Sequence, residues 1–411
     1  MAEWETTKIK YNGVYWNGLT YSPQDLCDEN EGTLVLRSSN IKDGQMTYYD
    51  NVYVKCPIES KALIKKNDIL ICSRNGSKEL IGKNAIYTKD EKMAFGAFMM
   101  IYRCKNPRYM YYVLNSDIFK ENIGLFSTST VNQLTGAIFG NIKFPLPPEI
   151  IQKQIVQLLD PRCAKIDSLK NDIEKQIETL EQYKKSVITE AVTKGINPDV
   201  KMKDSGIEWI GEIPEHWETK RAKYIFTPRN DRGNKIELQL LSPTQKYGVI
   251  PQALYDEISG MNSVKLKENT DFNLLKTCHK GDYCISLRSF QGGFEYSKYE
   301  GVVSPAYQIF YPTIKIADGY YKYLFKEKNF IEKINSFTLS LRDGKPISYF
   351  DFSNMYLPLP SAEEQKEIAD FLDSKCSAID SIITTKKQQL EKLEEYKKSL
   401  IFEYVTGKRE V

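Results

Sequence analysis

The stretch PLPPEIIQKQIVQLLDPRCAKIDS, which begins at Pro145, returns as PLPSAEEQKEIADFLDSKCSAIDS from Pro358. LEQYKKSVITEAVT from Leu180 likewise returns as LEEYKKSLIFEYVT from Leu393, at the same offset of 213 residues. Aligned without gaps from the two prolines, 24 of 49 positions are identical. Chance would leave only a few identities, so we infer that the chain repeats one unit twice.

The beginning of the unit also repeats at this offset, whereas its interior does not. Trp4-Glu5-Thr6 and Lys10-Tyr11 are matched by Trp217-Glu218-Thr219 and Lys223-Tyr224. In between the similarity is faint, with Asp68 and Arg74 aligned to Asp282 and Arg288 at an offset of 214. The chain therefore reads as a variable domain and a helix, followed by a second variable domain and a second helix.

Both repeated segments have the pattern of long helices. Ser361-x-x-Glu364 is a capping-box sequence, and Pro147 and Pro148 suit the first turn of the first helix. Apolar residues recur at alternating spacings of four and three, which predicts a coiled-coil seam over about four heptads. The seam residues are Ile166, Ile173, Ile177, Leu180, Val187 and Ala191, interrupted by Lys170 and Lys184, and Ile379, Ile383, Leu390, Leu393, Leu400 and Tyr404, interrupted by Lys386 and Lys397.

Two like seams in one chain favour mutual antiparallel packing over two helices packed separately on their own domains. About 45 helical residues would span on the order of 65 Å. Such a pair would be a rigid spacer with one globular domain at each end. Pro161 predicts a kink or break in the first helix, because proline lacks an amide hydrogen and clashes with the preceding turn.

The expected fold class is α+β with a pseudo-two-fold internal repeat, in which two mixed α/β globular domains are separated by two long antiparallel helices. Within the domains, NDILICS from Asn67 and GDYCISL from Gly281 are predicted as strands, and 109–122 and 320–334 as helices. The expected boundaries are 1–144 for the first domain, 145–195 for the first helical spacer, 196–213 for a linker, 214–357 for the second domain and 358–411 for the second helical spacer.

Composition argues against several classes of protein. Hydrophobic content of 41% and charged content of 27% are those of an ordinary soluble globular protein. No stretch is apolar enough for a membrane span and the N-terminus has no secretory pattern, so a cytoplasmic location is expected. Eight scattered cysteines without a CxxC pair argue against a disulfide framework, and two histidines argue against zinc sites. A net charge of +3 is too small to indicate nucleic-acid binding by itself.

Catalytic signatures are missing from the sequence. It has no GxxxxGK[ST] phosphate loop, no GxGxxG after a strand, and no Asn/Asp-Pro-Pro-Tyr/Phe pattern of amino methyltransferases. We therefore expect a non-catalytic chain that binds no cofactor or metal of its own. One alternative is a stand-alone magnesium-dependent nuclease using Asp50, Glu59 and Lys61, and another is a scaffold that joins two binding domains without contacting DNA.

Several motifs at the joints of the repeat resemble one known family. The PLPP and PLPSAEEQ segments, LEEYKKS, the helix ends AVTKG and YVTGK, and the linker GIEWIGEIPEHWE from Gly206 together look like the specificity (S) subunit of type I restriction-modification enzymes. The resemblance covers the whole chain in order. SRNG from Ser73 and the STST…NQL loop resemble the target-recognition domains of that family, while the N-terminus keeps only a remnant of the linker motif.

The resemblance implies a sequence-specific DNA-binding function. Each globular domain would be a target-recognition domain that reads one half of a bipartite, asymmetric sequence, and the helix pair would fix the gap between the halves. Two methyltransferase subunits, using S-adenosylmethionine, would dock on the helices and flanking domain surfaces. Translocase/nuclease subunits, using ATP and magnesium, would complete the complex.

Candidate DNA contacts are Arg, Lys, Asn and Gln residues in loops rich in Gly and Ser, because Arg and Lys suit guanine while Asn and Gln suit adenine. Arg74 and Arg288 are favoured because they follow equivalent strands, with a structural salt bridge shared by both copies as the alternative. The candidates are Arg74, Asn75, Lys78, Lys83, Asn132 and Gln133 in the first domain, and Arg229, Arg232, Arg288, Gln291, Arg342 and Lys345 in the second.

Overall fold

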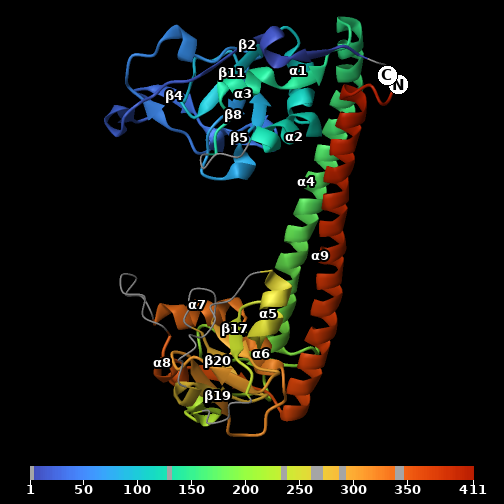
Figure 1. The fold of residues 1–411 in the computed structure, drawn as a ribbon. Coiled ribbons are helices and arrows are strands. Elements are labelled where there is room, and N and C mark those ends of the chain that lie inside the picture. The colour runs from blue at the N-terminus through green and yellow to red at the C-terminus, as the bar shows by residue number, and fades with distance from the viewer. Residues whose placement is uncertain (1–3, 127–131, 233–237, 261–271, 287–292, 338–346) are drawn as a thin grey trace. The chain divides into compact units, whose positions relative to one another are not determined.

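A computed structural model describes residues 4–126, 132–232, 238–260, 272–286, 293–337 and 347–411 of the chain. The chain divides into two compact units (Figure 1). Unit 1 comprises Met1–Glu174 and Lys386–Val411, and unit 2 comprises Lys175–Thr385. Each unit therefore contains one globular domain and part of each long helix, α4 (Glu149–Lys194) and α9 (Ala362–Val405). The predicted fold class, with two mixed domains and two long helices, is confirmed.

The domain of unit 1 is built around a four-stranded antiparallel sheet in the order β2-β11-β8-β9. Its two central strands are buried apolar runs, ILIC in β8 (Ile69–Cys72) and MMIY at the start of β11 (Met99–Cys104). β2 (Gly13–Asn17) and β9 (Asn84–Ile86) pair on either side. The helices α1 (Pro107–Leu114), α2 (Asp117–Phe126) and α3 (Gly136–Asn141) contribute buried side chains to the same core.

The remaining strands of unit 1 form smaller sheets. β1 pairs with β12, which leads the chain into α4, and β10, β4, β7 and β3 make a second four-stranded sheet. These strands are β1 (Thr6–Lys8), β3 (Leu26–Cys27), β4 (Thr33–Leu36), β5 (Ile41–Lys42), β6 (Gln45–Met46), β7 (Tyr53–Val54), β10 (Ala94–Phe95) and β12 (Lys143–Pro145).

Unit 2 has the same central sheet, in the order β16-β23-β20-β21. It is formed by β16 (Phe226–Arg229), β23 (Gln308–Pro312), β20 (Tyr283–Ile285) and β21 (Phe294–Tyr296). β8 and β20 lie within the two segments that the sequence predicts as strands. The helices are α5 (Gln252–Ser259), α6 (Tyr320–Leu324), α7 (Lys328–Ser336) and α8 (Tyr349–Asn354). The other strands are β13 (Met202–Asp204), β14 (Glu212–Pro214), β15 (Glu218–Arg221), β17 (Leu241–Thr244), β18 (Gly248–Pro251), β19 (Lys276–Cys278), β22 (Gly301–Val303) and β24 (Tyr356–Leu359).

Each helix predicted inside a domain is two helices in the structure. Segment 109–122 spans α1 and α2, and segment 320–334 spans α6 and α7. Asn115 follows the last turn of α1 and donates its side-chain amide back to the Tyr111 carbonyl. In unit 2 the Glu327 carboxylate caps α7 by accepting from the Phe330 amide. Local side-chain caps of this kind end one helix and begin the next.

The segment expected to be a linker packs in the core of unit 2. β13 pairs with β14, and between them Trp209 and Ile210 are buried. Trp217 is buried as well and lies edge-on to Tyr320 in α6. The GIEWIGEIPEHWE motif therefore covers the core of the second domain. Its remnant in unit 1, Trp4, is partly buried against the core of that unit.

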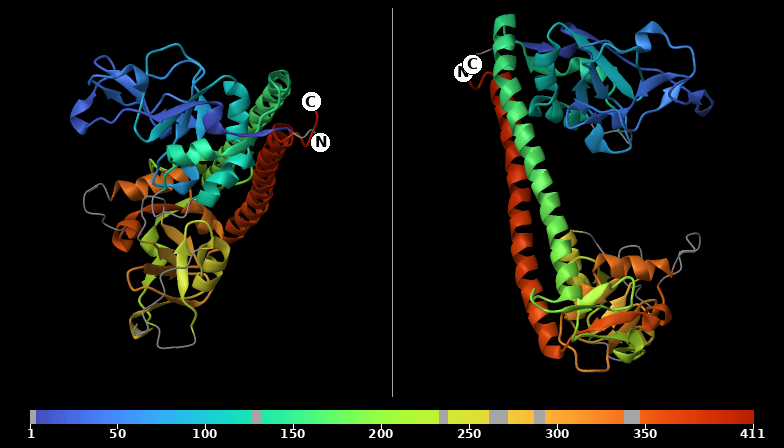
Figure 2. Two further views of the ribbon diagram at one scale, coloured as in Figure 1. Left: turned by 45° about the horizontal axis from the view of Figure 1, so that its top comes forward. Right: turned by 180° about the vertical axis from the view of Figure 1, so that it is seen from behind.

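In both units α4 and α9 lie side by side and run in opposite directions (Figure 2). Lys397 binds Asp167 at 2.6 Å in unit 1, and Lys184 binds Asp380 at 2.6 Å in unit 2. These two pairs are equivalent, since each residue has its counterpart 213 positions away. The predicted antiparallel pairing is therefore confirmed within each unit, and Lys170, Lys184 and Lys397, which interrupt the seam, make ion pairs across it.

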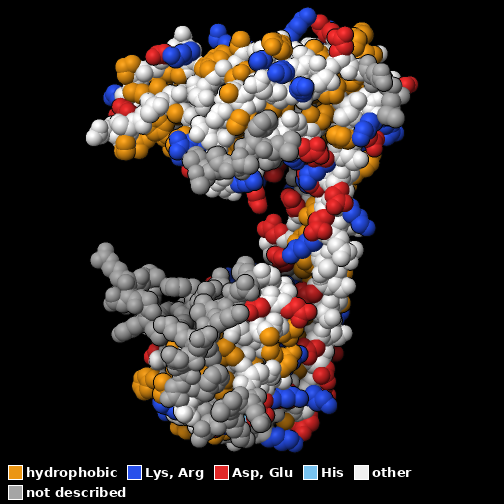
Figure 3. Space-filling model, in the orientation of Figure 1, with side chains coloured by type: hydrophobic (Ala, Val, Ile, Leu, Met, Phe, Trp, Pro, Cys, Tyr) orange, Lys and Arg blue, Asp and Glu red, His pale blue; other side chains and the backbone are white. Residues whose placement is uncertain are grey.

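The apolar seam is confirmed as well. All twelve predicted seam residues are buried or partly buried, including Ile166 and Leu400 in unit 1 and Ala191 and Ile379 in unit 2. Elsewhere on the helices, Lys and Arg side chains are interspersed with Asp and Glu side chains (Figure 3). This arrangement of an apolar stripe and a mixed charged surface is what a two-helix seam requires.

A glutamine anchors the start of each long helix. Gln152 donates to the Pro147 carbonyl at 2.8 Å and accepts from the Asn106 amide at 2.7 Å. Its equivalent, Gln365, donates to the Pro360 carbonyl at 2.9 Å and accepts from a backbone amide of the domain. Both side chains are buried. These bonds give a physical reason for the PLPP…Q and PLPS…Q sequences, because they attach helix and domain rigidly to each other.

Pro161 does not break the first helix. α4 runs without interruption from Glu149 to Lys194 with Pro161 inside it. Pro161 is exposed, while Leu159 and Cys163 on either side are buried in the core of unit 1. We infer that this packing offsets the hydrogen bond that proline removes, so the prediction of a break is wrong.

Candidate nucleic-acid interface

A buried carboxylate holds the central sheet of each domain together. In unit 1, Asp68 is 1% exposed and accepts two hydrogen bonds of 2.6 Å from Arg103. In unit 2, its equivalent Asp282 is 2% exposed and accepts bonds of 2.8 and 3.1 Å from Arg229. Each carboxylate also accepts the backbone amide three residues before it. The hydrogen bonds that Arg103 donates to Asp68 raise the pKa of the Arg103 guanidinium.

The two arginines stand on different strands. Register places Arg103 of β11 opposite Val14 of β2, and Arg229 of β16 opposite Ile309 of β23. By this register Arg229 occupies the position of Trp16, and Tyr311 occupies that of Arg103. In each unit one of these two positions holds the arginine and the other holds an aromatic ring. The guanidinium lies over that ring, Arg103 over Trp16 at 5.1 Å in unit 1 and Arg229 over Tyr311 at 4.1 Å in unit 2. The cation and the aromatic ring have exchanged strands between the copies, while the carboxylate has stayed in place.

This geometry gives Arg229 a structural role. Its guanidinium is 17% exposed and is shared between Asp282 and Asp231. A guanidinium held by two carboxylates and a ring has no free donor edge for a base. A structural salt bridge shared by both copies does exist, but Asp68 forms it with Arg103 and Asp282 forms it with Arg229. Arg74 takes no part in it. This geometry favours a structural role for Arg229 over the predicted DNA contact.

In unit 1, three loop segments meet at the end of β8. The Arg74 and Gln133 backbones form an isolated antiparallel bridge, and the Leu134 amide donates to the Ser73 carbonyl at 2.7 Å. The amides of Ser73 and Arg74 both donate to the Phe98 carbonyl. The structure therefore brings the predicted SRNG and NQL loops together.

The six candidates of this domain differ in what their side chains do. Asn75 donates to the Ser38 hydroxyl, Lys83 to the Ser38 carbonyl and Asn132 to the Gly76 carbonyl, at 3.0–3.1 Å. These three fix the loop shape. By contrast, Arg74, Lys78 and Gln133 are exposed, and within the described part of the chain their side chains make no ion pair or hydrogen bond.

Sequence reasoning missed one residue of this cluster, Phe98. Its ring is 59% exposed, and the Arg74 guanidinium lies over it at 5.2 Å. It sits in the apolar run GAFMMIY from Gly96, most of which is buried. The only available signal was the glycine before it, which places Phe98 in the turn that precedes β11.

Most candidates of the second domain cannot be placed. Arg288, Gln291, Arg342 and Lys345 lie outside the described residues. Arg232 is described: it is exposed, and its backbone forms an isolated bridge with Lys276.

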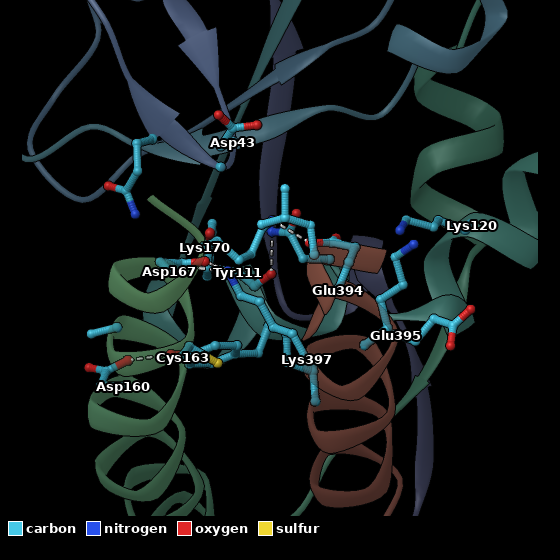
Figure 4. A pocket seen from close by; sticks show the side chains of 18 of the residues that line it. Asp43, Tyr111, Lys120, Asp160, Cys163, Asp167, Lys170, Glu394, Glu395 and Lys397 are labelled. Atoms are coloured by element: carbon cyan, nitrogen blue, oxygen red, sulfur yellow. Dashed lines mark hydrogen bonds and ion pairs between the residues drawn. The ribbon is translucent and has the colours of Figure 1, made fainter. Parts of the chain in front are cut away.

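A cavity of about 650 Å³ lies in unit 1 where α1, α4, α9 and the β5–β6 hairpin meet (Figure 4). Several of its charged side chains are paired: Asp160 accepts from Arg108 and Tyr112, Lys170 binds Glu394, and Lys397 binds Asp167. Although burial works in the opposite direction, the Lys170 bond lowers the pKa of Glu394. Burial raises the pKa of the Cys163 thiol, which disfavours its thiolate. These ion pairs give part of the cavity wall a structural role.

The nuclease alternative finds no support in the geometry. Asp50 binds Arg37 at 3.1 Å, whereas Glu59 and Lys61 bind each other at 2.8 Å. Among the residues that the structure describes, no group of three His, Cys, Asp or Glu side chains could hold a metal ion. In the same described part of the chain, no helix is long and apolar enough to cross a membrane.

Two domains that share a frame but differ in their loops, each joined to a helix of the repeated sequence, have the architecture of a recognition protein with two binding domains. The family model for the type I restriction modification DNA specificity domain matches the chain twice, over residues 2–179 and 214–394. The chain belongs to this family of non-catalytic, sequence-specific DNA-binding subunits, as its motifs led us to expect.

Curated relatives agree with this assignment. The chain is 28% identical over 99% of its length to the putative type I restriction enzyme MjaX specificity subunit of Methanocaldococcus jannaschii, 93% of which is covered. It is 27% identical, over 89% of its length and 86% of the relative, to the MjaVIII specificity subunit of the same organism. A solved chain from work on complex assembly and conformational transition of the type I R-M system has the same fold, with a TM-score of 0.69, 14% identity, and 99% and 98% of the two chains covered.

Proposed function

We propose that the chain reads a bipartite, asymmetric DNA sequence, with one half-site recognised by the domain of each unit. The observation that supports this proposal is that the two copies of the repeat share their frame residues but differ in their loops. The Gln152 and Gln365 anchors, the Asp167–Lys397 and Lys184–Asp380 pairs and the buried Asp68 and Asp282 have counterparts in both copies. The loops that follow β8 and β20 differ in sequence. A common frame with different loops suits two different half-sites.

The helix pair is proposed to set the gap between the half-sites. α4 has 46 residues, which corresponds to a length of about 70 Å at about 1.5 Å per residue. Half-sites read from one side of B-DNA lie about one turn apart, roughly 34–36 Å. Helices of this length leave room for that distance and for the width of a domain at each end.

Exposed apolar residues on the helices support docking of one kind of partner at two equivalent places. Leu169 and Tyr396 are 43% and 54% exposed in unit 1, and their counterparts Ile382 and Tyr183 are 46% and 53% exposed in unit 2. In heptad terms all four flank the seam on the side away from the Lys–Asp pairs. Apolar side chains that stay exposed in both copies are typical of a binding surface. We propose that two methyltransferase subunits, which use S-adenosylmethionine, dock there.

Further subunits complete the proposed assembly. A net charge of +3 is small for a chain that binds DNA alone, so the docked subunits would supply many of the phosphate contacts. ATP-dependent translocase/nuclease subunits, which require magnesium, would bind the resulting complex.

Co-expression with the methyltransferase subunit, followed by mapping of methylated bases across the genome, tests the function. We expect one bipartite motif that depends on this chain. Exchanging the domain of unit 2 for that of a relative should change one half-site and keep the other. Absence of any motif that depends on this chain would contradict the proposal.

The docking surface is tested separately. Tyr183→Ser with Tyr396→Ser should reduce co-purification of the methyltransferase. The control is the loop residue Tyr49, which is even more exposed, and Tyr49→Ser should leave co-purification unchanged. Unaltered co-purification of the double variant would place the docking surface elsewhere.

A further inference from the structure

A rigid turn presents an aromatic ring to solvent at the loop cluster of unit 1. Gly96, Ala97, Phe98 and Met99 form this turn, closed by the Met99 amide bond to the Gly96 carbonyl at 2.8 Å. The Phe98 carbonyl accepts the Ser73 amide at 3.0 Å, the Arg74 amide at 3.1 Å and the Ser73 hydroxyl at 2.9 Å. Three bonds to one carbonyl fix the backbone of Phe98 while its ring stays 59% exposed.

The ring supports a guanidinium that makes no ion pair or hydrogen bond with any of the described residues. Arg74 lies 5.2 Å from the Phe98 ring centroid. No carboxylate among the described residues pairs with Arg74, in contrast to Arg103 and Arg229, which each lie over a ring and also bind a buried carboxylate. Stacking on a ring orients a guanidinium but leaves its in-plane donors available.

The platform is specific to the first domain. The pairing of β11 with β2, and of β23 with β16, places Phe98 at the position of Ala306. Buried frame residues such as Asp68 and Asp282 are shared, so this ring belongs to the part of the domain that differs between the copies. An exposed aromatic residue at a position where the other copy has Ala306 fits a role in the half-site of the first domain and not in common assembly.

We propose that Arg74, held flat by Phe98, donates a bidentate pair of hydrogen bonds to a guanine in the half-site read by unit 1. Bidentate donation to O6 and N7 in the major groove is the geometry that suits guanine. Gln133, bridged to Arg74 by the backbone, presents its amide at the adjacent base pair. Phe98 is a positioning residue, and Arg74 reads the base. The inference rests on the proposed bipartite function.

The test is methylation-motif mapping and DNA-binding measurements on the complete complex with its methyltransferase subunits. Arg74→Lys keeps the charge but loses the planar fork, so preference for guanine at one position should fall roughly 10- to 100-fold. Binding to DNA that lacks the site should change little. Phe98→Leu should weaken the same preference, and Phe98→Trp should restore most of it because it keeps a ring beneath the guanidinium.

The possible outcomes distinguish a failure of the guanine assignment from a failure of the proposed bipartite function. If the wild-type complex methylates a bipartite motif and Arg74→Lys leaves every guanine preference unchanged, the guanine assignment is wrong while the proposed function stands. If the wild-type complex shows no sequence preference, the proposed function itself fails. Equal weakening on all sequences would make Arg74 a phosphate contact and also overturn the assignment.

Arg409, which lies over Tyr404 at 5.5 Å and binds Glu403, is the matched control, and Arg409→Lys should leave the motif unchanged.

Discussion

The exchange of cation and ring between the copies predicts that unit 1 will accept the arrangement of unit 2. Arg103→Tyr alone leaves Asp68, at 1% exposure, without its guanidinium, and breaking a buried ion pair costs about 3–5 kcal/mol. Trp16→Arg alone brings a second guanidinium beside the first and removes the indole hydrogen bond to the Lys61 carbonyl, at roughly 2–3 kcal/mol. Together the two changes recreate the layout of Arg229 and Tyr311.

We therefore expect the double variant to be more stable than Arg103→Tyr. The remaining cost of the double variant is the lost indole bond and some packing, about 1–2 kcal/mol. The coupling between the two changes should therefore be about 4–6 kcal/mol, which exceeds the cost of Trp16→Arg alone. Unfolding of the full chain is not a single transition when it has two compact units. Hydrogen exchange read on peptides from β8 and β11 confines the measurement to unit 1.

A double variant no more stable than Arg103→Tyr would refute the exchange. The reciprocal pair in unit 2, Arg229→Trp with Tyr311→Arg, provides the matched control. If the arginine and the aromatic ring compensate for each other, each double variant should change hydrogen-exchange protection only in the unit that carries it.

Three further predictions follow from the helices and the frame. Seven residues of helical heptad inserted after both Glu174 and Thr385 should lengthen the spacer by about 10 Å, and the mapped motif should gain about three base pairs of gap with both half-sites kept; an unchanged gap would contradict the spacer role. Pro161→Ser, which copies Ser374 of the second helix, should stabilise unit 1 by about 1–3 kcal/mol, measured by hydrogen exchange in α4, because proline costs about 3 kcal/mol inside a helix. Arg229→Met should lower the stability of unit 2 by about 3–5 kcal/mol in the same measurement, yet the folded fraction should keep its half-site preference; a changed preference would show that Arg229 reads DNA after all.

The parts of the fold that sequence could predict are those governed by periodicity and local chemistry. The seam from Ile166 to Ala191, its counterpart from Ile379 to Tyr404 and the strands after Asn67 and Gly281 follow from residue spacing and turn residues. Pro161 shows the limit of local rules, since a break depends on whether tertiary packing offsets one lost hydrogen bond.

The candidate site was less predictable for a similar reason. Residue type cannot distinguish Arg74, which is open to solvent, from Arg229, whose guanidinium is held by Asp282 from a distant part of the chain. Asn75 and Asn132 have suitable side chains for adenine, but the loop uses their amides internally. The position of Phe98 depends on a turn whose bonds come from Ser73 and Arg74, far away in sequence.

Both ends of the chain belong to unit 1, where the strand β1 pairs beside the start of α4 and the last turns of α9 enter the core through Leu400 and Tyr404. The connectivity of the chain is therefore nearly circular, because each domain leads into a long helix that ends in the other unit. A circular connectivity has no preferred position for the chain termini. A circular permutant opened near Ile196 and joined from Val411 to Met1 should keep every contact within both units, so the order of the domains along the chain is separable from the order in which they meet DNA.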